Sequence, residues 1–257
     1  MLVPDLSLQT IVQSLKDYID TSHYNENEDR LKIMNYYEGI NLEEEVMNYF
    51  DPNALQFAPI LATNITKKLI DARYIAYKSA PERTADDRYL ERLGDLDQDM
   101  IEVDRLTGLL GTVAVLRYYD EDKDRLDSHI ITDFEPIFKQ NNPDPIGIIY
   151  PLFSHGDMKA EEQQFVYWSN ESHFKIKKSG EVIHVNDEDI NPFGVVPIVY
   201  SHLYPMLGNE FIRTGKGKMV ANANLLYNIF GTQLSLGNMY QSLGQSVLTG
   251  VDETTRL

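Results

Sequence analysis

The first part of the chain repeats apolar residues with the period of an α-helix. In the first segment the apolar positions are Leu8, Ile11, Val12, Leu15, Tyr18 and Ile19. Polar residues fill the opposite face, and Asp5 or Ser7 is the expected cap. A second segment begins near Asn27 and ends at Gly39, a residue type that adopts the left-handed conformation after a helix. The residues that it directs inward are Leu31, Met34 and Tyr37. Two amphipathic helices are therefore predicted, followed by an irregular acidic stretch.

Residues 64–83, NITKKLIDARYIAYKSAPER, are predicted to form a third helix. Pro81 stops it because proline disfavours helical geometry at the preceding residue. Apolar residues occupy two neighbouring stripes of this helix. Those that we expect to be buried are Ile65, Leu69, Ile70 and Tyr74. Those that we expect to face solvent or the acids of a neighbouring subunit are Lys67, Lys68 and Arg73.

A long helix is predicted after the turn at Pro81. Thr84 is its expected cap, and Asp86 and Asp87 stand near the positive end of the helix dipole, where acids are favourable. Its apolar residues, spaced by three, four and seven, are Leu90, Leu93, Leu96, Met100, Val103 and Leu110. The pattern predicts one continuous helix of roughly 25 residues.

After Gly111 the period changes to two, which predicts β-strands. The charged turn DEDKDR lies between TVAVLRYY and SHIITDF, and the later segments are IGIIYPLF, QQFVYW, HFKIK, EVIHV and NPFGVVPIVYSHL. These segments are expected to pair as antiparallel strands. Helical spacing then returns through Leu225, Ile229, Leu236 and Tyr240. The predicted fold is α+β, with helices in residues 1–110, a β-rich part in 111–205 and a closing helix in 206–257.

Composition and charge exclude several classes of protein. The chain has no cysteine, which excludes disulfides, thiolate zinc sites and cysteine nucleophiles. The opening MLVPDLSLQTIVQSLKDYID lacks the pattern of a secretory signal, and no apolar run reaches the ~20 residues of a membrane span. A net charge of −17 disfavours binding to polyanions, so a sequence-reading DNA-binding protein is not expected.

Two motifs that suggest binding sites are incomplete. RTGKGKM resembles a phosphate-binding loop, but Glu210 and Gly217 stand where the Walker pattern requires Gly and then Ser or Thr. We interpret it as a basic turn that opens a helix, and a weak phosphate or subunit contact by Lys216 and Lys218 stays open. DEDKDR begins like a calcium loop but lacks the required Gly and Glu, so a solvated hairpin tip is expected.

No catalytic residue, metal site or cofactor is assigned, and the protein is expected not to be an enzyme. Asp95, Asp97 and Asp99 stand two positions apart, which on a helix directs them to different sides. With Asp120 and Asp122 they belong to the alternative function, a metal-dependent nuclease or phosphodiesterase, which needs converging carboxylates. No two histidines stand four positions apart as helical metal ligands would. The six histidines of the chain are His23, His129, His155, His173, His184 and His202.

Several short motifs occur in a characteristic order. An early helix ends in a YY-x-G element at Tyr36, Tyr37 and Gly39, and Asn64 precedes a helix that ends in AYKSAPER, where Ser79 or Ala80 replaces the expected glycine. The next segments are LTGLLGTVAVLRYYDED and PFGVVPIVYS. The last is a helix with Asn near its middle that leads to a glycine, through Asn222, Asn224, Asn228 and Gly250. In this order the motifs resemble the amino-terminal half of the portal proteins of tailed bacteriophages, over roughly residues 30 to 250.

The resemblance implies a structural subunit of a ring of about twelve copies at one vertex of a capsid. Duplex DNA would pass through this ring during packaging and ejection without sequence-specific binding. The implied partners are further copies of the chain, the major capsid protein, the terminase and tail adaptor proteins, with no membrane. The protein would assemble in the host cytoplasm and reside in the virion. This chain would supply the wing region, and residues 206–257 would lead toward a stem that lies beyond them. A monomeric α+β interaction module is the remaining alternative.

Overall fold

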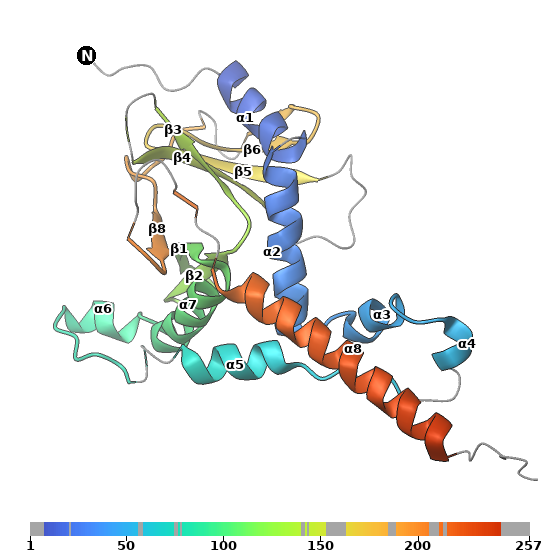
Figure 1. Cartoon of the computed structure of the whole chain (residues 1–257). Coiled ribbons are helices and arrows are strands. Elements are labelled where there is room, and N and C mark those ends of the chain that lie inside the picture. The colour runs from blue at the N-terminus through green and yellow to red at the C-terminus, as the bar shows by residue number, and fades with distance from the viewer. Residues whose placement is uncertain are drawn as a thin grey trace, which may run out of the picture. The chain divides into compact units, whose positions relative to one another are not determined.

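The fold is α+β, as predicted, and along the sequence helices precede and follow a β-rich segment, whose strands are labelled in Figure 1. The computed structural model describes residues 8–20, 22–55, 59–74, 77, 79–139, 142, 144–152, 163–184, 189–205, 211–212 and 215–242. The predicted caps Asp5 and Ser7, together with His155 and Gly250, lie outside these residues. Among the described residues, no helix is both long enough and apolar enough to cross a membrane.

The helices differ in length and number from those that the sequence predicts. They are α1 (Leu8–Asp20), α2 (Ser22–Glu38), α3 (Leu42–Met47), α4 (Pro52–Leu55), α5 (Ile65–Arg73), α6 (Asp87–Glu91), α7 (Leu96–Leu110) and α8 (Gly217–Ser242). α3 and α4 lie in the stretch that we expected to be irregular. α3 forms there because Glu43, Glu44 and Glu45 occupy its first turn, where acids favour a helix, while Leu42 and Val46 are buried.

The single long helix predicted after Thr84 is wrong, because the chain breaks between α6 and α7. The cap of α6 is Asp86, whose side chain accepts a hydrogen bond from the backbone N–H of Arg88 at 2.9 Å. At the break Gly94 adopts a φ of +61°, and a Cβ there would lie 2.6 Å from the carbonyl oxygen of Leu126. The carbonyl of Arg92 accepts a hydrogen bond from the N–H of Leu126 at 2.7 Å. A contact with the start of a strand therefore overrides the helical spacing.

The strands form two antiparallel sheets in the described part of the chain. Their bounds are β1 (Thr112–Asp120), β2 (Arg125–Ile131), β3 (Glu135–Phe138), β4 (Pro145–Pro151), β5 (Gln164–Ser169), β6 (His173–Lys177), β7 (Val182–Ile183) and β8 (Ile198–His202). One sheet has the order β2-β1-β8 and the other the order β3-β4-β5-β6-β7. The predicted hairpin across DEDKDR is confirmed, with Asp120 opposite Arg125. β3 was not predicted.

The chain divides into two compact units that interleave in sequence. The sheet unit consists of Met1–Met34 and Leu69–Lys218, and the helical unit of Asn35–Lys68 and Met219–Leu257. The boundaries of these two units differ from those at residues 110 and 205, which the sequence predicts.

In the sheet unit, the five-stranded sheet is covered on both faces. Alternate residues of β4 and β5 belong to two different hydrophobic clusters, as the two-residue period of a strand requires. One cluster includes Ile11 and Leu15 of α1, and the other includes Ala114 of β1 and Ile198 of β8. Helix α1 therefore covers one face and the three-stranded sheet covers the other.

The buried face of α5 differs from the prediction by one position. Ile70 is 1% exposed, whereas Leu69 is 50% exposed, so the prediction that Leu69 is buried is wrong. Ile65 and Tyr74 are partly buried, and Lys67, Lys68 and Arg73 are exposed as predicted. The helix ends at Arg73 rather than near Pro81, so the long apolar stripe that included Leu69 does not form. In α2, similarly, Leu31 is 45% exposed and Ile33 is buried.

Candidate functional site

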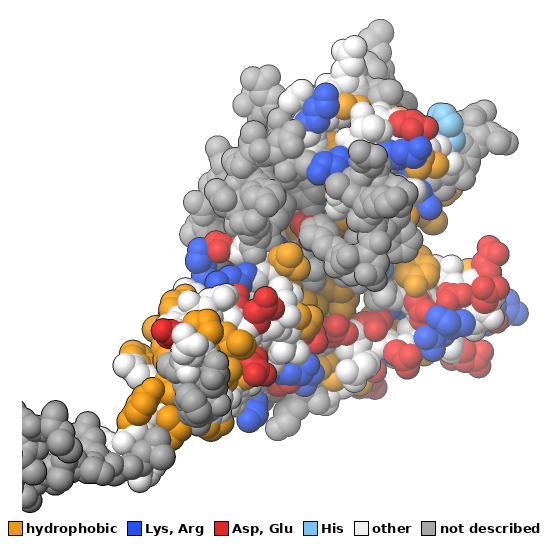
Figure 2. All heavy atoms as spheres, turned by 90° about the vertical axis from the view of Figure 1, so that its right-hand side faces the viewer, with side chains coloured by type: hydrophobic (Ala, Val, Ile, Leu, Met, Phe, Trp, Pro, Cys, Tyr) orange, Lys and Arg blue, Asp and Glu red, His pale blue; other side chains and the backbone are white. Residues whose placement is uncertain are grey.

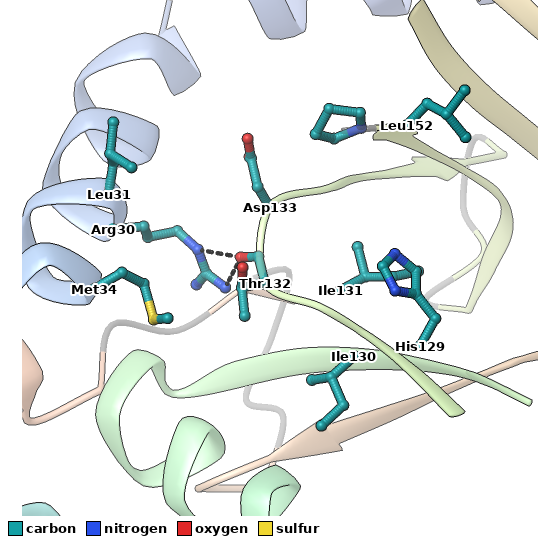
Figure 3. Close-up of a pocket in the computed structure, with 10 residues that line it drawn as sticks. Arg30, Leu31, Met34, His129, Ile130, Ile131, Thr132, Asp133 and Leu152 are labelled. Atoms are coloured by element: carbon teal, nitrogen blue, oxygen red, sulfur yellow. Dashed lines mark hydrogen bonds between the residues drawn. The ribbon is translucent and has the colours of Figure 1, made fainter. Parts of the chain in front are cut away.

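A pocket of about 340 Å³ opens in the sheet unit beside Arg30 of α2 (Figure 3). Its walls come from α2, from β2 and the turn after it, and from the end of β4. The lining residues are Arg30, Leu31, Met34, His129, Ile130, Ile131, Thr132, Asp133, Pro151 and Leu152. The volume lies at the lower end of the range for small-molecule pockets, and most of the wall is aliphatic. The pocket is suited to an apolar group.

The guanidinium of Arg30 binds backbone carbonyl groups in three segments. Nη1 donates to the carbonyl oxygen of Leu110 at 3.3 Å and Nη2 to that of Thr112 at 2.8 Å. Nε and Nη2 both donate to the carbonyl of Thr132, at 3.0 and 2.5 Å (Figure 3). Arg30 is only 8% exposed. It therefore fixes α2 to the junction of α7 with β1 and to the turn after β2, and its role at the pocket is structural. Sequence analysis did not find it, since a lone Arg in a helix carries no signal of burial.

Of the two lysines predicted as a weak phosphate or subunit contact, Lys216 directly precedes α8 and Lys218 lies in its first turn. Lys218 forms an ion pair with Asp29 of α2. A Cβ on Gly215 would lie 2.4 Å from the carbonyl oxygen of Leu109, and one on Gly217 would lie at the same distance from that atom. The glycines in GKGK are therefore required by close backbone packing, which supports the interpretation of a structural turn. A phosphate contact by Lys216 stays untested.

The acids of the alternative nuclease function bind different basic residues instead of converging. Asp95 pairs with Arg125 at 3.2 Å, Asp97 with Arg83, and Asp99 with Arg117 at 3.5 Å. Asp97 also accepts a hydrogen bond from the Tyr77 hydroxyl at 2.9 Å, and Arg83 and Tyr77 together lower the pKa of this carboxyl. No group of three or more His, Asp or Glu side chains among the described residues is arranged to hold a metal ion.

The tip of the β1–β2 hairpin is an exposed network of ion pairs. Lys123 lies 2.8 Å from a carboxylate oxygen of Asp120 and 2.8 Å from one of Asp127. Its ammonium group is the main reason that the pKa values of both carboxyls are lowered. Residues 121–124 are exposed, as expected for a solvated tip. Asp120 and Asp127 thus share Lys123, and Asp124 pairs with Arg92 at 3.0 Å, so these three acids have basic partners.

In the helical unit, the motif residues singled out by the portal resemblance meet one another. Asn64 donates from Nδ2 to the carbonyl of Tyr37 at 2.9 Å and packs against Gly39, where a Cβ would lie 3.0 Å from this nitrogen. The Oδ1 of Asn64 caps α5 by accepting from the N–H of Lys67 at 2.9 Å. Tyr36 of the same turn is buried with Leu42, Val46, Ala221 and Leu225.

Two asparagines of α8 hold the backbone that precedes α5. Asn224 accepts at Oδ1 from the N–H groups of Ile65 and Thr66, at 2.5 and 2.9 Å, and donates to the carbonyl of Thr63 at 3.0 Å. Asn228 binds both backbone groups of Thr63, at 3.1 Å each. Thr232, one turn further on, accepts from the N–H of Leu61 at 2.9 Å. Sequence analysis had not singled out Thr232, although its spacing of four from Asn228 places it on the same face.

No protein-family model matches the chain, and no curated protein matches it significantly in sequence.

Proposed function

We propose that the chain is a subunit of a ring-forming portal-like assembly, in which it supplies the wing region. Duplex DNA would pass through such a ring, driven by a separate motor, and the subunit itself would carry no catalytic residue. The observation that carries the proposal is the meeting of the motif residues in the helical unit. Tyr36 to Gly39, Asn64 and two of the α8 asparagines, Asn224 and Asn228, are far apart in sequence but share one hydrogen-bonded and packed cluster, whereas Asn222 is exposed.

A second pair of motif segments also meets, in the sheet unit. LTGLLGTVAVLRYYDED contains the end of α7 and β1, and PFGVVPIVYS contains β8. β8 pairs with β1 in antiparallel register, with Thr112 opposite His202 and Leu116 opposite Ile198. The ordered motifs thus describe two packed clusters rather than unrelated short matches, which favours a common architecture with the portal family.

The electrostatics are compatible with a protein that lets DNA pass without holding it. The net charge of −17 repels phosphates on average, and several of the described basic residues, among them Arg83, Arg117, Lys123 and Lys218, are paired with acids of the same chain. We therefore expect binding to duplex DNA to be weaker than micromolar at physiological salt and independent of sequence. A submicromolar, sequence-dependent affinity would contradict the proposal.

The proposed assembly is tested by its mass and shape. The chain, expressed with any reading frame that follows Leu257, is analysed by light scattering and by electron microscopy of stained particles. Closed rings of about twelve copies are expected, since head-to-tail contacts form rings when the rotation closes. A compact dimer as the largest species, or DNA cleavage that depends on added Mg²⁺ or Mn²⁺, would refute the portal assignment.

A further inference from the structure

The outer face of α8 carries large apolar residues along the described length of this helix, interrupted by the polar Asn222 and Gln233. The large apolar residues on it are Met219, Leu226, Tyr227, Phe230, Leu234 and Tyr240, and each is 52–66% exposed. The opposite face is buried within the helical unit, through Ala221, Asn224, Leu225, Asn228, Thr232 and Leu236. A surface helix normally has a polar outer side. α8 therefore has two packing faces, and the chain itself covers one of them.

Four of the six large outer residues, all except Tyr227 and Leu234, follow the repeat of a helix–helix seam. The first row contains Met219, Leu226, Gln233 and Tyr240, which are seven residues apart. The second row contains Ala223, Phe230 and Gly237, with the same spacing. The rows are offset so that successive positions alternate by four and three residues, which is the pattern of the a and d positions of a coiled coil. Such a seam packs best against another helix with the same repeat.

The seam carries no charge that would select an ionic partner. The sequence has no Asp, Glu, Lys or Arg between Lys218 and Asp252, although the whole chain has a net charge of −17. Nucleic acid, or a basic or acidic peptide, would find no charged group along this face of α8. Figure 2 looks from the side on which α8 ends in Figure 1 and shows hydrophobic side chains gathered at the lower left. An apolar helix is the occupant that fits.

The exposed area is sufficient for a stable contact between two copies. Aromatic side chains bury 150–250 Å² when covered, so Tyr227, Phe230 and Tyr240, each more than half exposed, leave on the order of 350 Å², and the similarly exposed Met219, Leu226 and Leu234 add a somewhat smaller area. A standard interface takes about 800 Å² from each partner, whereas a typical monomer exposes no apolar patch above roughly 600 Å². The outer face of α8 alone thus supplies most of one side of a standard interface.

We propose that the outer face of α8 packs against α8 of a second copy of the chain. The contact is independent of the proposed function, because a seam that packs on itself joins copies in pairs, whereas a ring would close through head-to-tail contacts at other surfaces. Since the seam is uncharged while the chain as a whole is acidic, association should strengthen with salt, which screens the repulsion between subunits.

Two phenylalanines of equal exposure provide a matched test. Phe230 at the centre of the seam is 63% exposed, and Phe193 of the sheet unit is 62% exposed. Sedimentation velocity over a concentration series should show self-association of the parent and of Phe193→Glu with the same dissociation constant. Phe230→Glu should weaken it by about tenfold or more, since it places two carboxylates against each other in an apolar seam. Circular dichroism should show the same helix content in all three proteins, because the buried face of α8 is unchanged.

Disulfide formation gives a second readout, because the chain has no cysteine of its own. Position 230 lies midway between positions 223 and 237, so a single Phe230→Cys should cross-link two copies whether the two helices run parallel or antiparallel. Ala223→Cys alone should cross-link only a parallel pair. A mixture of Ala223→Cys and Gly237→Cys proteins should cross-link an antiparallel pair. Phe193→Cys is the control and should give no cross-linked dimer.

The outcomes separate this inference from the portal assignment. A parent that stays monomeric at all concentrations overturns the inference. An oligomer whose dissociation constant does not change in Phe230→Glu, and which forms no disulfide at position 230, also overturns the inference. Such an oligomer leaves a ring possible through other surfaces. A dimer that is cross-linked through position 230 and never grows further supports the inference and refutes the portal assignment.

Discussion

The imidazole ring of His173 stacks on the indole ring of Trp168, with the ring centroids 3.4 Å apart and the planes inclined by 10°. The two residues face each other across β5 and β6, and the indole N–H donates to the Tyr150 hydroxyl at 3.3 Å. Burial, aided by nearby Lys175 and opposed by Asp189, lowers the pKa of the His173 imidazole to about 4. The neutral ring is therefore the form that the fold stabilises.

The first prediction is a loss of stability in mild acid. Because the pKa of His173 is lower in the folded than in the unfolded chain, the unfolded chain binds more protons between about pH 6.5 and pH 4. The contribution of His173 is thus present above pH 6.5 and lost as the pH falls toward 4. Urea unfolding at several pH values should show a flatter dependence for His173→Phe, by on the order of 1 kcal/mol over this window. Burial also lowers the pKa of His202, and this residue affects the curves of the parent and the variant equally. Parallel curves for parent and variant would contradict this account.

The second prediction uses two adjacent residues of α5. Ile70→Asp should unfold the sheet unit or cost several kcal/mol, because it places a carboxylate in the core without a partner. Leu69→Asp should change the free energy of unfolding by less than about 1 kcal/mol, since Leu69 is half exposed. Thermal melts of both variants test the buried face of α5. Equal losses of stability from the two substitutions would mean that Leu69 is buried like Ile70, as the sequence pattern predicts.

The third prediction concerns the asparagines of α8. Asn228→Leu should cost about 1–3 kcal/mol, because it leaves the partly buried N–H of Thr63 without its hydrogen bond and removes one of the two donors to the Thr63 carbonyl, which keeps the bond from Asn224. Asn222→Leu is the matched control on the exposed side of the same helix and should stay within about 0.5 kcal/mol of the parent. Chemical denaturation measures both. If Asn228→Leu were as stable as Asn222→Leu, the asparagine would not be holding the segment before α5.

The fourth prediction concerns the arginine beside the pocket. Arg30→Met keeps the length of the side chain but removes the donors to the carbonyls of Leu110, Thr112 and Thr132, at a cost of about 2–4 kcal/mol. Arg73→Met removes an exposed arginine and should cost less than about 0.5 kcal/mol. Amide hydrogen exchange should show faster opening at the start of β1 in Arg30→Met alone. Unchanged exchange there would mean that the guanidinium does not fix this junction.

Local sequence patterns were sufficient to predict those elements whose structure depends mainly on their own residues. The β1–β2 hairpin follows from a period of two on both sides of an acidic turn, and α8 follows from its helical spacing. The pattern failed where a distant backbone decides. Gly94 looks tolerable within a helix until the carbonyl of Leu126 is placed 2.6 Å from its missing Cβ.

Periodicity also cannot tell which of two apolar faces is the inner one. Leu69 and Ile70 are both apolar and adjacent, and only the tertiary packing distinguishes them. Tyr240 belongs to an apolar row of α8 but is 57% exposed, while Leu236 of the same helix is buried. The asparagines of α8 were identified by the resemblance, but the partners of Asn224 and Asn228, at residues 63–66, became visible only in the folded chain.

The interleaving of the two units sets the order in which a growing chain can be completed. Residues 69–218 are synthesised between the two segments of the helical unit. At about 5–20 residues per second, Asn35–Lys68 waits on the order of ten to thirty seconds before α8 leaves the ribosome. During this time Leu42 and Val46 have no α8 to cover them, and the backbone at Thr63 has no asparagine to bind. We expect the sheet unit to become complete first, while the nascent first half of the helical unit depends on shielding by a chaperone.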